Sequence, residues 1–176
     1  GYNYGNFVYM EHMDPMWLFS TYLGNAFGNF LSGLPLGNTM LGLNLYTGLF
    51  VSVLAVAGYF FFVKEVKLAP TLAFVGEILV INLCWCPTAL LYNYLSYTLL
   101  GTGGVLLYFA LMKGRRSSLC FILAGVALGI NVFVRFPNLA NMALIVAVWA
   151  MGIIRREKLI TVLKQTGLCI LGYVIG

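Results

Sequence analysis

Apolar residues occur along the chain in long, almost unbroken runs, without the apolar–polar alternation of half-buried strands. An α-helix rises about 1.5 Å per residue, so about 20 apolar residues cross a hydrocarbon layer about 30 Å thick. Continuous runs favour helices over the strands of a membrane barrel. We therefore expect an all-α fold, a polytopic transmembrane helical bundle of five or six spans, the last beginning near Thr166 and truncated. The first five runs cover 40–63, 70–86, 92–112, 118–134 and 138–154.

The first 39 residues precede these runs and have a different pattern. Pro15 suits the first turn of a helix, and apolar side chains follow it at helical spacing over 15–31. We expect this segment to be a helix lying in the membrane interface. The predicted organisation is an extracytoplasmic loop with an interfacial helix over 1–39 and a transmembrane helical bundle over 40–176.

Both ends of the chain look like cuts. The first residues include no initiating Met and no signal-peptide pattern. The apolar run that begins at Thr166 stops at Gly176. We expect the chain to be a fragment of a longer one, truncated at both ends.

Basic residues mark alternate loops between the runs. They follow the first, third and fifth runs: Lys64, Lys67, Lys113, Arg115, Arg116, Arg155, Arg156 and Lys158. The loop after the second run carries no charge, and the loop after the fourth carries only Arg135. The positive-inside rule places the basic loops in the cytoplasm and residues 1–39 outside. We expect an integral protein of a bacterial cytoplasmic membrane.

The composition supports a membrane environment. Hydrophobic residues make up 61% of the chain and charged residues 9%, with a mean hydropathy of +0.93, whereas soluble domains average about 45–50% and about 25%. The net charge of +5 does not indicate a nucleic-acid partner, because the basic residues lie at the ends of apolar runs and form no stripe with interleaved aromatics. Membrane lipid is the partner that this pattern predicts.

Glu11, His12 and Asp14 form the first candidate site. Two carboxylates and an imidazole within four positions could supply a general base or hold a metal ion. The same residues also fit an ordinary solvated loop. Only five acidic residues occur in the chain, and two of them are here, which favours a functional role. A divalent cation is a candidate cofactor, although no complete set of metal ligands is evident.

Glu77 lies within the second run, about 10 Å from its cytoplasmic end. A carboxylate in a membrane costs a few kcal/mol at least, so we expect it to face the bundle interior. It is either an intramembrane functional site or the acceptor of a structural hydrogen bond, for instance from Asn131 or the Asn82 side of the helix.

Arg135 stands on the side of the membrane that lacks other basic residues, before a turn at Pro137 and Asn138. Its guanidinium could clamp an anion such as a phosphate. Alternatively, the side chain extends to lipid phosphate at the interface.

Small residues four apart predict close helix packing in two of the runs. The pairs are Gly125 with Gly129, and Ala143 with Ala147.

Two phrases in the sequence resemble the GT-C superfamily of polytopic glycosyltransferases, in its bacterial mannosyltransferase-like branch. They are Tyr92-Asn93-Tyr94-Leu95-Ser96 and the stretch from Ala124-Gly125 to Val134-Arg135-Phe136-Pro137-Asn138. The layout is similar as well, with an acidic outer loop, an interfacial helix and many spans joined by short loops.

This resemblance implies an enzyme that moves a sugar from a polyprenyl-phosphate donor at the outer membrane face. It makes Asp14 the first candidate for the base or metal ligand and Glu11 the second. Arg135 would bind the lipid-linked phosphate, and His12 and Asn138 complete the expected substrate-binding set.

Two other interpretations stay open. A secondary transporter would use Glu77 as its proton or ion site near the membrane midplane. A non-enzymatic membrane subunit would need no such site. Substitutions separate the three, because the enzyme needs Asp14 or Glu11 and the transporter needs Glu77.

Overall fold

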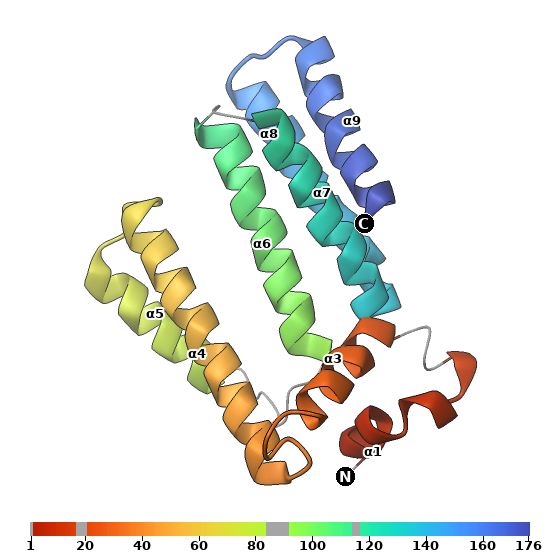
Figure 1. The fold of residues 1–176 in the computed structure, drawn as a ribbon. Coiled ribbons are helices and arrows are strands. Elements are labelled where there is room, and N and C mark those ends of the chain that lie inside the picture. Colours follow the sequence, from red (N-terminus) through yellow and green to blue (C-terminus); the bar gives the residue numbers. More distant parts are fainter. Residues whose placement is uncertain (1, 17–20, 84–91, 114–116) are drawn as a thin grey trace.

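The computed structural model describes residues 2–16, 21–83, 92–113 and 117–176. Within these residues the regular structure is entirely helical, which confirms the predicted all-α class (Figure 1). Elements labelled η are 3₁₀-helices. The elements in chain order are α1 (Tyr2–Val8), η1 (Met10–His12), α3 (Tyr22–Ser32), α4 (Met40–Lys64), α5 (Pro70–Leu83), α6 (Tyr92–Lys113), α7 (Ser117–Val134), η2 (Phe136–Ile145), α8 (Val146–Ile154) and α9 (Leu159–Ile175).

Among the described residues, three helices are long and apolar enough to cross a membrane: Met40–Lys64, Tyr92–Met112 and Phe136–Ile154. Shorter apolar helices lie beside them: Pro70–Val80, Ser118–Val134 and Leu159–Ile175. A helix of 14 residues such as α5 is only about 21 Å long. The chain therefore has the helices of a membrane protein, and the full number of five or six spans stays a prediction.

The long elements run alternately up and down (Figure 1). Side-chain contacts bring the three basic loops to one end, which we call the basic end. The Tyr108 hydroxyl donates to the Glu65 carbonyl oxygen at 2.9 Å. The Arg155 guanidinium donates to the Leu111 carbonyl oxygen and contacts Met112 Sδ at 3.3 Å. The N-terminal elements and the α7–η2 junction lie at the opposite end, in agreement with the charge pattern of the loops (Figure 1).

Two boundaries differ from the sequence prediction. The helix expected over 15–31 is interrupted, because Thr21 has a φ of −138° and caps a helix that begins at Tyr22; residues 17–20 lie outside the described part. The fifth span begins as a 3₁₀-helix. Pro at its start has no N–H to donate, and the Asn138 N–H bonds the Arg135 carbonyl oxygen three residues back. The end of the predicted second span, 84–86, lies outside the described part of the chain, and α5 is described to Leu83.

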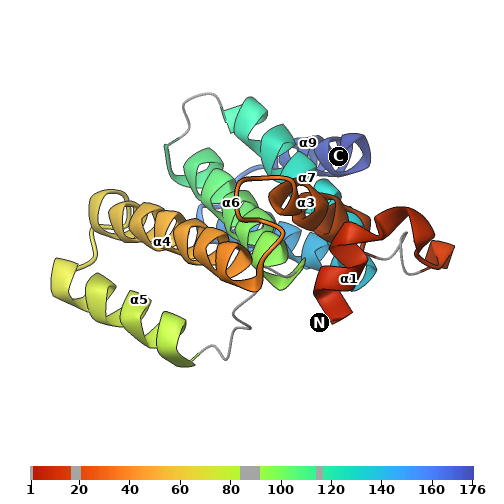
Figure 2. The same cartoon turned by 60° about the horizontal axis from the view of Figure 1, so that its bottom comes forward.

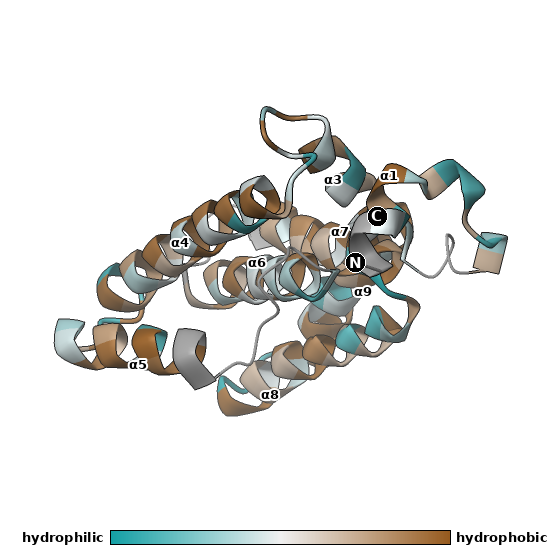
Figure 3. Cartoon of the chain, turned by 90° about the horizontal axis from the view of Figure 1, so that it is seen from below, coloured by the Kyte–Doolittle hydropathy of each residue, from teal (hydrophilic) through white to brown (hydrophobic). Residues whose placement is uncertain are grey.

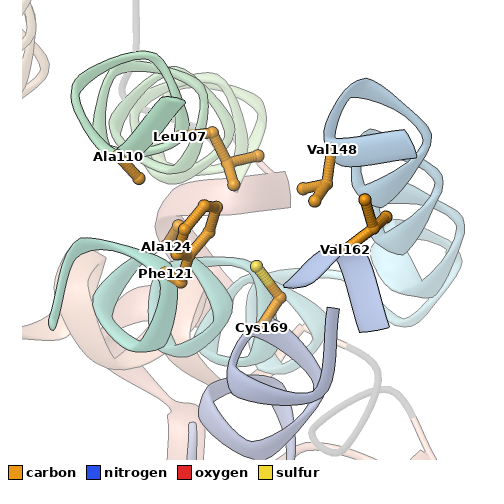
Figure 4. Packing of buried hydrophobic residues seen from close by; sticks show 7 residues of the cluster. All are labelled: Leu107, Ala110, Phe121, Ala124, Val148, Val162 and Cys169. Atoms are coloured by element: carbon orange, nitrogen blue, oxygen red, sulfur yellow. The ribbon is translucent and has the colours of Figure 1, made fainter. Parts of the chain in front are cut away.

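Two clusters of buried apolar residues hold the elements together. One, near the basic end, joins α6, α7, α8 and α9 through Leu107, Ala110, Phe121, Ala124, Val148, Val162 and Cys169 (Figure 4). The other, at the opposite end, joins α1, α3, α4 and α6 through Phe7, Leu31, Leu43 and Tyr94. The second cluster fixes the N-terminal segment against the bundle.

Glycines bring α7 and α9 into backbone contact. A Cβ atom added at Gly125 would lie 2.7 Å from the Tyr173 nitrogen, and one added at Gly172 would strike the Ile122 carbonyl oxygen. Gly129 has the same close approach to the end of α9. The expected role of Gly125 and Gly129 is thus confirmed. Ala143 and Ala147 are both exposed, so the same expectation for that pair is wrong.

The outward faces of the helices are apolar, as a lipid environment requires. Apolar residues line most of the length of α4 and α8 (Figure 3). Leu41, Ile153 and Val174 are 78%, 76% and 77% exposed. In water, such surfaces would drive aggregation, whereas acyl chains cover them without cost.

The α7–α9 contact predicts opposite effects for two glycine-to-alanine substitutions. Gly125→Ala should lower the free energy of unfolding by about 1–3 kcal/mol, because the methyl group meets backbone atoms that cannot move aside. Gly101→Ala in α6, where nothing lies within 4 Å of the added Cβ, should be neutral or stabilising. Thermal unfolding in detergent micelles measures both. Equal effects would show that α7 and α9 do not approach this closely.

The charge pattern predicts the sidedness of single cysteines. In a chain whose four native cysteines are replaced by alanine, Met16→Cys should react with a membrane-impermeant maleimide in intact cells. Val66→Cys, in the first basic loop, should react only after the membrane is permeabilised. Both native side chains are exposed, so access to the reagent depends on the membrane alone. Labelling of both sites in intact cells would contradict the proposed topology.

Candidate functional site

Five side chains from three elements meet at the end of the bundle opposite the basic end. Tyr92 and Ser96 lie four residues apart on α6, so they share one face of that helix. Asn131 and Arg135 have the same spacing at the end of α7, and Asn138 lies in the first turn of η2. We call these five residues the polar cluster.

A network of neutral amides forms the interior of the polar cluster. Asn131 is fully buried, and its Nδ2 donates to the Ser96 carbonyl oxygen at 3.2 Å. Asn138 Nδ2 donates to Ser96 Oγ at 2.7 Å and to Asn131 Oδ1 and the Asn131 carbonyl oxygen, each at 3.0 Å. The network joins α6, α7 and η2, and it satisfies polar groups that would be costly to leave unpaired in an apolar bundle.

Arg135 occupies the junction between α7 and η2 in an extended conformation, with φ −160° and ψ 122°. Its N–H donates to the Asn131 carbonyl oxygen at 3.3 Å, and its own carbonyl oxygen accepts from the Asn138 N–H at 2.9 Å. The side chain is exposed, and its guanidinium carbon lies 5.3 Å from the centre of the Tyr92 ring. Within the described part of the chain, no carboxylate forms an ion pair with this guanidinium.

The N-terminal elements also pack against Tyr92, in addition to its contact with Arg135. A Cβ atom added at Gly24 in α3 would lie 2.9 Å from Tyr92 Cβ, so the backbone of α3 lies directly on the start of α6. α1 holds α3 in turn, because Asn29 Nδ2 donates to the Phe7 carbonyl oxygen at 2.6 Å. Figure 2 shows α1 and α3 at this end of the bundle.

The predicted acidic site is an exposed loop attached to these elements. Glu11 and His12 lie in η1, and both are exposed. The exposed Asp14 carboxylate accepts the Met16 N–H at 2.9 Å, which is the bond of a residue that caps a turn. In the described residues, no group of three His, Cys, Asp or Glu side chains is placed to hold a metal ion.

Glu77 is half-buried on α5 and faces α4. A Cβ atom at Gly58 of α4 would lie 2.6 Å from Glu77 Oε1, so the missing side chain of Gly58 leaves room for the carboxylate. The suggested hydrogen bond from Asn131 is wrong, because the Asn131 amide is bonded to Ser96 instead. The side chain of Asn82 lies outside the described part.

Sequence reasoning found Arg135 and Asn138 but missed Ser96 and the role of Asn131 in the same cluster. Asn138 was expected to bind substrate, whereas its amide hydrogens are occupied by Ser96 and Asn131. The spacing of four residues within each helix, in segments that are otherwise apolar, was the available signal. The pairing between helices could not be read from the sequence, because it depends on how α6 and α7 are packed.

Comparison of the chain with protein-family models, with curated proteins and with solved structures found no match. We therefore infer the function from the geometry of the polar cluster and from the chemistry of its residues.

The amide network predicts a difference between two asparagines. Asn131→Ala should lower the free energy of unfolding by about 1–3 kcal/mol, because it leaves the Ser96 carbonyl and the Asn138 amide short of buried partners. Asn44→Ala on α4 should change it by less than about 0.5 kcal/mol, since Asn44 is exposed. Chemical unfolding of the two purified variants in the same detergent measures both. Equal stability of the two variants would contradict a buried network at Asn131.

Proposed function

We propose that this protein is a membrane glycosyltransferase of the GT-C type, which moves a sugar from a polyprenyl-phosphate donor to an acceptor at the outer face of a bacterial cytoplasmic membrane. The observation that carries the proposal is the exposed guanidinium of Arg135. Nine of the ten Lys and Arg residues lie in or near the basic loops, and Arg135 is the exception. A cation that forms no ion pair with the described part of the chain, at the end of a transmembrane bundle, is suited to the phosphate of a lipid.

The proposed reaction needs a base and a stabilised leaving group. Asp14, with Glu11 as the second candidate, accepts the proton of an acceptor hydroxyl. The hydroxyl oxygen then bonds to the anomeric carbon of the sugar, and the bond between that carbon and the phosphate oxygen breaks. Arg135 stabilises the negative charge that remains on the lipid phosphate. His12 stands beside these acids in the sequence and completes the proposed binding surface.

The placement of the N-terminal segment supports this assignment of roles. α3 packs against Tyr92, and the ring of Tyr92 contacts the guanidinium of Arg135. Glu11 lies in η1 and Asp14 follows it, and Figure 1 shows these N-terminal elements at the same end of the molecule as the junction of α7 and η2.

A transporter is the alternative that Glu77 favours. The Glu77 carboxylate faces Gly58 between α4 and α5, whereas Arg135 lies at the junction of α7 and η2. Such a protein would depend on Glu77 and would tolerate changes to Arg135 and Asp14.

Sugar transfer from a labelled polyprenyl-phosphate donor, in membranes that carry the full protein, tests the proposal. Asp14→Asn should reduce the rate about 100-fold or more, since it removes the base, while the amide still caps the turn as well as aspartate does. Arg135→Gln should have an effect of similar size. Lys158→Gln at the basic end and Glu77→Gln serve as controls and should retain activity.

Two results would overturn the proposal. One is full activity in each of the three single variants Asp14→Asn, Glu11→Gln and Arg135→Gln. The other is the absence of transfer from any donor by the wild type, combined with solute uptake that is lost in Glu77→Gln.

A further inference from the structure

We propose that Ser96, Asn131 and Asn138 are positioning residues that hold the Arg135 guanidinium ready for a phosphate monoester. This inference rests on the proposed function, because the phosphate in question is that of a polyprenyl-phosphate lipid. None of the three side chains needs to touch the ligand. They act by fixing the backbone of Arg135 and the position of Tyr92.

The backbone of Arg135 is held on both sides by the same two asparagines. Its N–H bonds the carbonyl oxygen of Asn131, and its carbonyl oxygen accepts the N–H of Asn138. The Asn138 amide closes the loop by donating to that same Asn131 carbonyl oxygen. The first of these backbone bonds is the usual α-helical bond to the residue four back, and the second is the three-residue bond that begins η2. If Arg135 continued α7, the Asn138 N–H would leave the Arg135 carbonyl oxygen, so this bond fixes the point at which the chain turns and the exposed Arg135 side chain departs.

Ser96 connects these hydrogen bonds to Tyr92, whose ring the guanidinium contacts. It lies one helical turn after Tyr92 on α6, and its hydroxyl and carbonyl oxygens accept from Asn138 and Asn131 respectively. Any sliding of α6 along α7 would break both bonds and carry the Tyr92 ring away from Arg135. The network thus fixes the cation and the ring relative to each other.

A fixed guanidinium binds an anion more tightly than a mobile one. A free Arg side chain loses conformational entropy when it orders around a ligand, and this loss weakens binding. The Tyr92 ring holds the guanidinium by a cation–π contact at 5.3 Å, which uses none of its N–H groups, and these can therefore donate to two phosphate oxygens. The gain should therefore appear in the affinity for the phosphate lipid and should vanish when Arg135 is absent.

Binding of a sugar-free polyprenyl phosphate to the full protein in nanodiscs, followed by native mass spectrometry, provides the test. Ser96→Ala removes one acceptor of the network and should weaken binding about 3- to 10-fold. Ser96→Thr keeps the hydroxyl and should restore most of the affinity. Ser52→Ala is the matched control, because Ser52 is another helical serine whose hydroxyl bonds only within its own helix, to the Gly48 carbonyl oxygen.

The decisive measurement is a double-mutant cycle with Arg135→Gln. If Ser96 acts through Arg135, Ser96→Ala should cause no further loss of affinity in the Arg135→Gln background. An equal loss in both backgrounds, or no loss in either, would overturn the positioning role while leaving the phosphate site in place. Unchanged binding by Arg135→Gln alone would remove the phosphate site, and the proposed function and this inference would both fail.

Discussion

The close contact of α7 with its neighbours determines where the other elements can lie. Glycines on α7 and α9 remove the side chains that would otherwise separate the two helices, so their backbones meet directly. Bilayer lipid is as apolar as the side chains, and close packing therefore has to supply the association that water exclusion supplies in soluble proteins. The other side of α7 packs against α6, where Leu128 fills the space over Gly103. α7 is consequently the helix whose position sets the register of α6 and α9.

The register of α6 and α7 determines which polar side chains meet at one end of the pair. There the helices present Ser96 and Asn131 to each other, and the chain turns back through Arg135 to supply Asn138. The 3₁₀ geometry of η2 belongs to this turn. Proline at its start and the bond from the Asn138 N–H to the Arg135 carbonyl favour the tighter helix. Packing along the helices and hydrogen bonding at their ends therefore depend on the same alignment.

The general class of the fold could be predicted because it follows from local quantities. Run length and the absence of alternation give helices, and the charge of successive loops gives their alternate direction. The glycine pair of α7 was also visible as a spacing.

The features that could not be predicted depend on contacts between distant segments. They are the close contact of Gly24 with Tyr92, the room that Gly58 leaves for Glu77, and the failure of Ala143 and Ala147 to pack. The break at Thr21 was missed because apolar spacing continues across a residue whose backbone leaves the helical range. At the site, Arg135 was visible as a charge in an unexpected place, whereas Ser96 looked like one of many small polar residues.

The chemistry of the residues around Arg135 suits a cation that has to remain available. A carboxylate partner would have fixed the guanidinium as firmly, but it would have neutralised the charge and occupied the edges that a phosphate needs. Burying such an ion pair would also have required the desolvation of two charges. Neutral groups avoid both problems. The backbone groups of Asn131 and Asn138 bond the backbone of Arg135, while their side-chain amides bond Ser96 and each other, so neither residue occupies the guanidinium. The Tyr92 ring, whose centre lies 5.3 Å from the guanidinium carbon, attracts the cation without neutralising it. The same logic distinguishes Arg135 from Arg155 at the basic end, whose guanidinium donates to the Leu111 carbonyl oxygen and joins two helices. The protein bonds Arg155 through its guanidinium and Arg135 through its backbone, and this difference is what the proposed phosphate site requires.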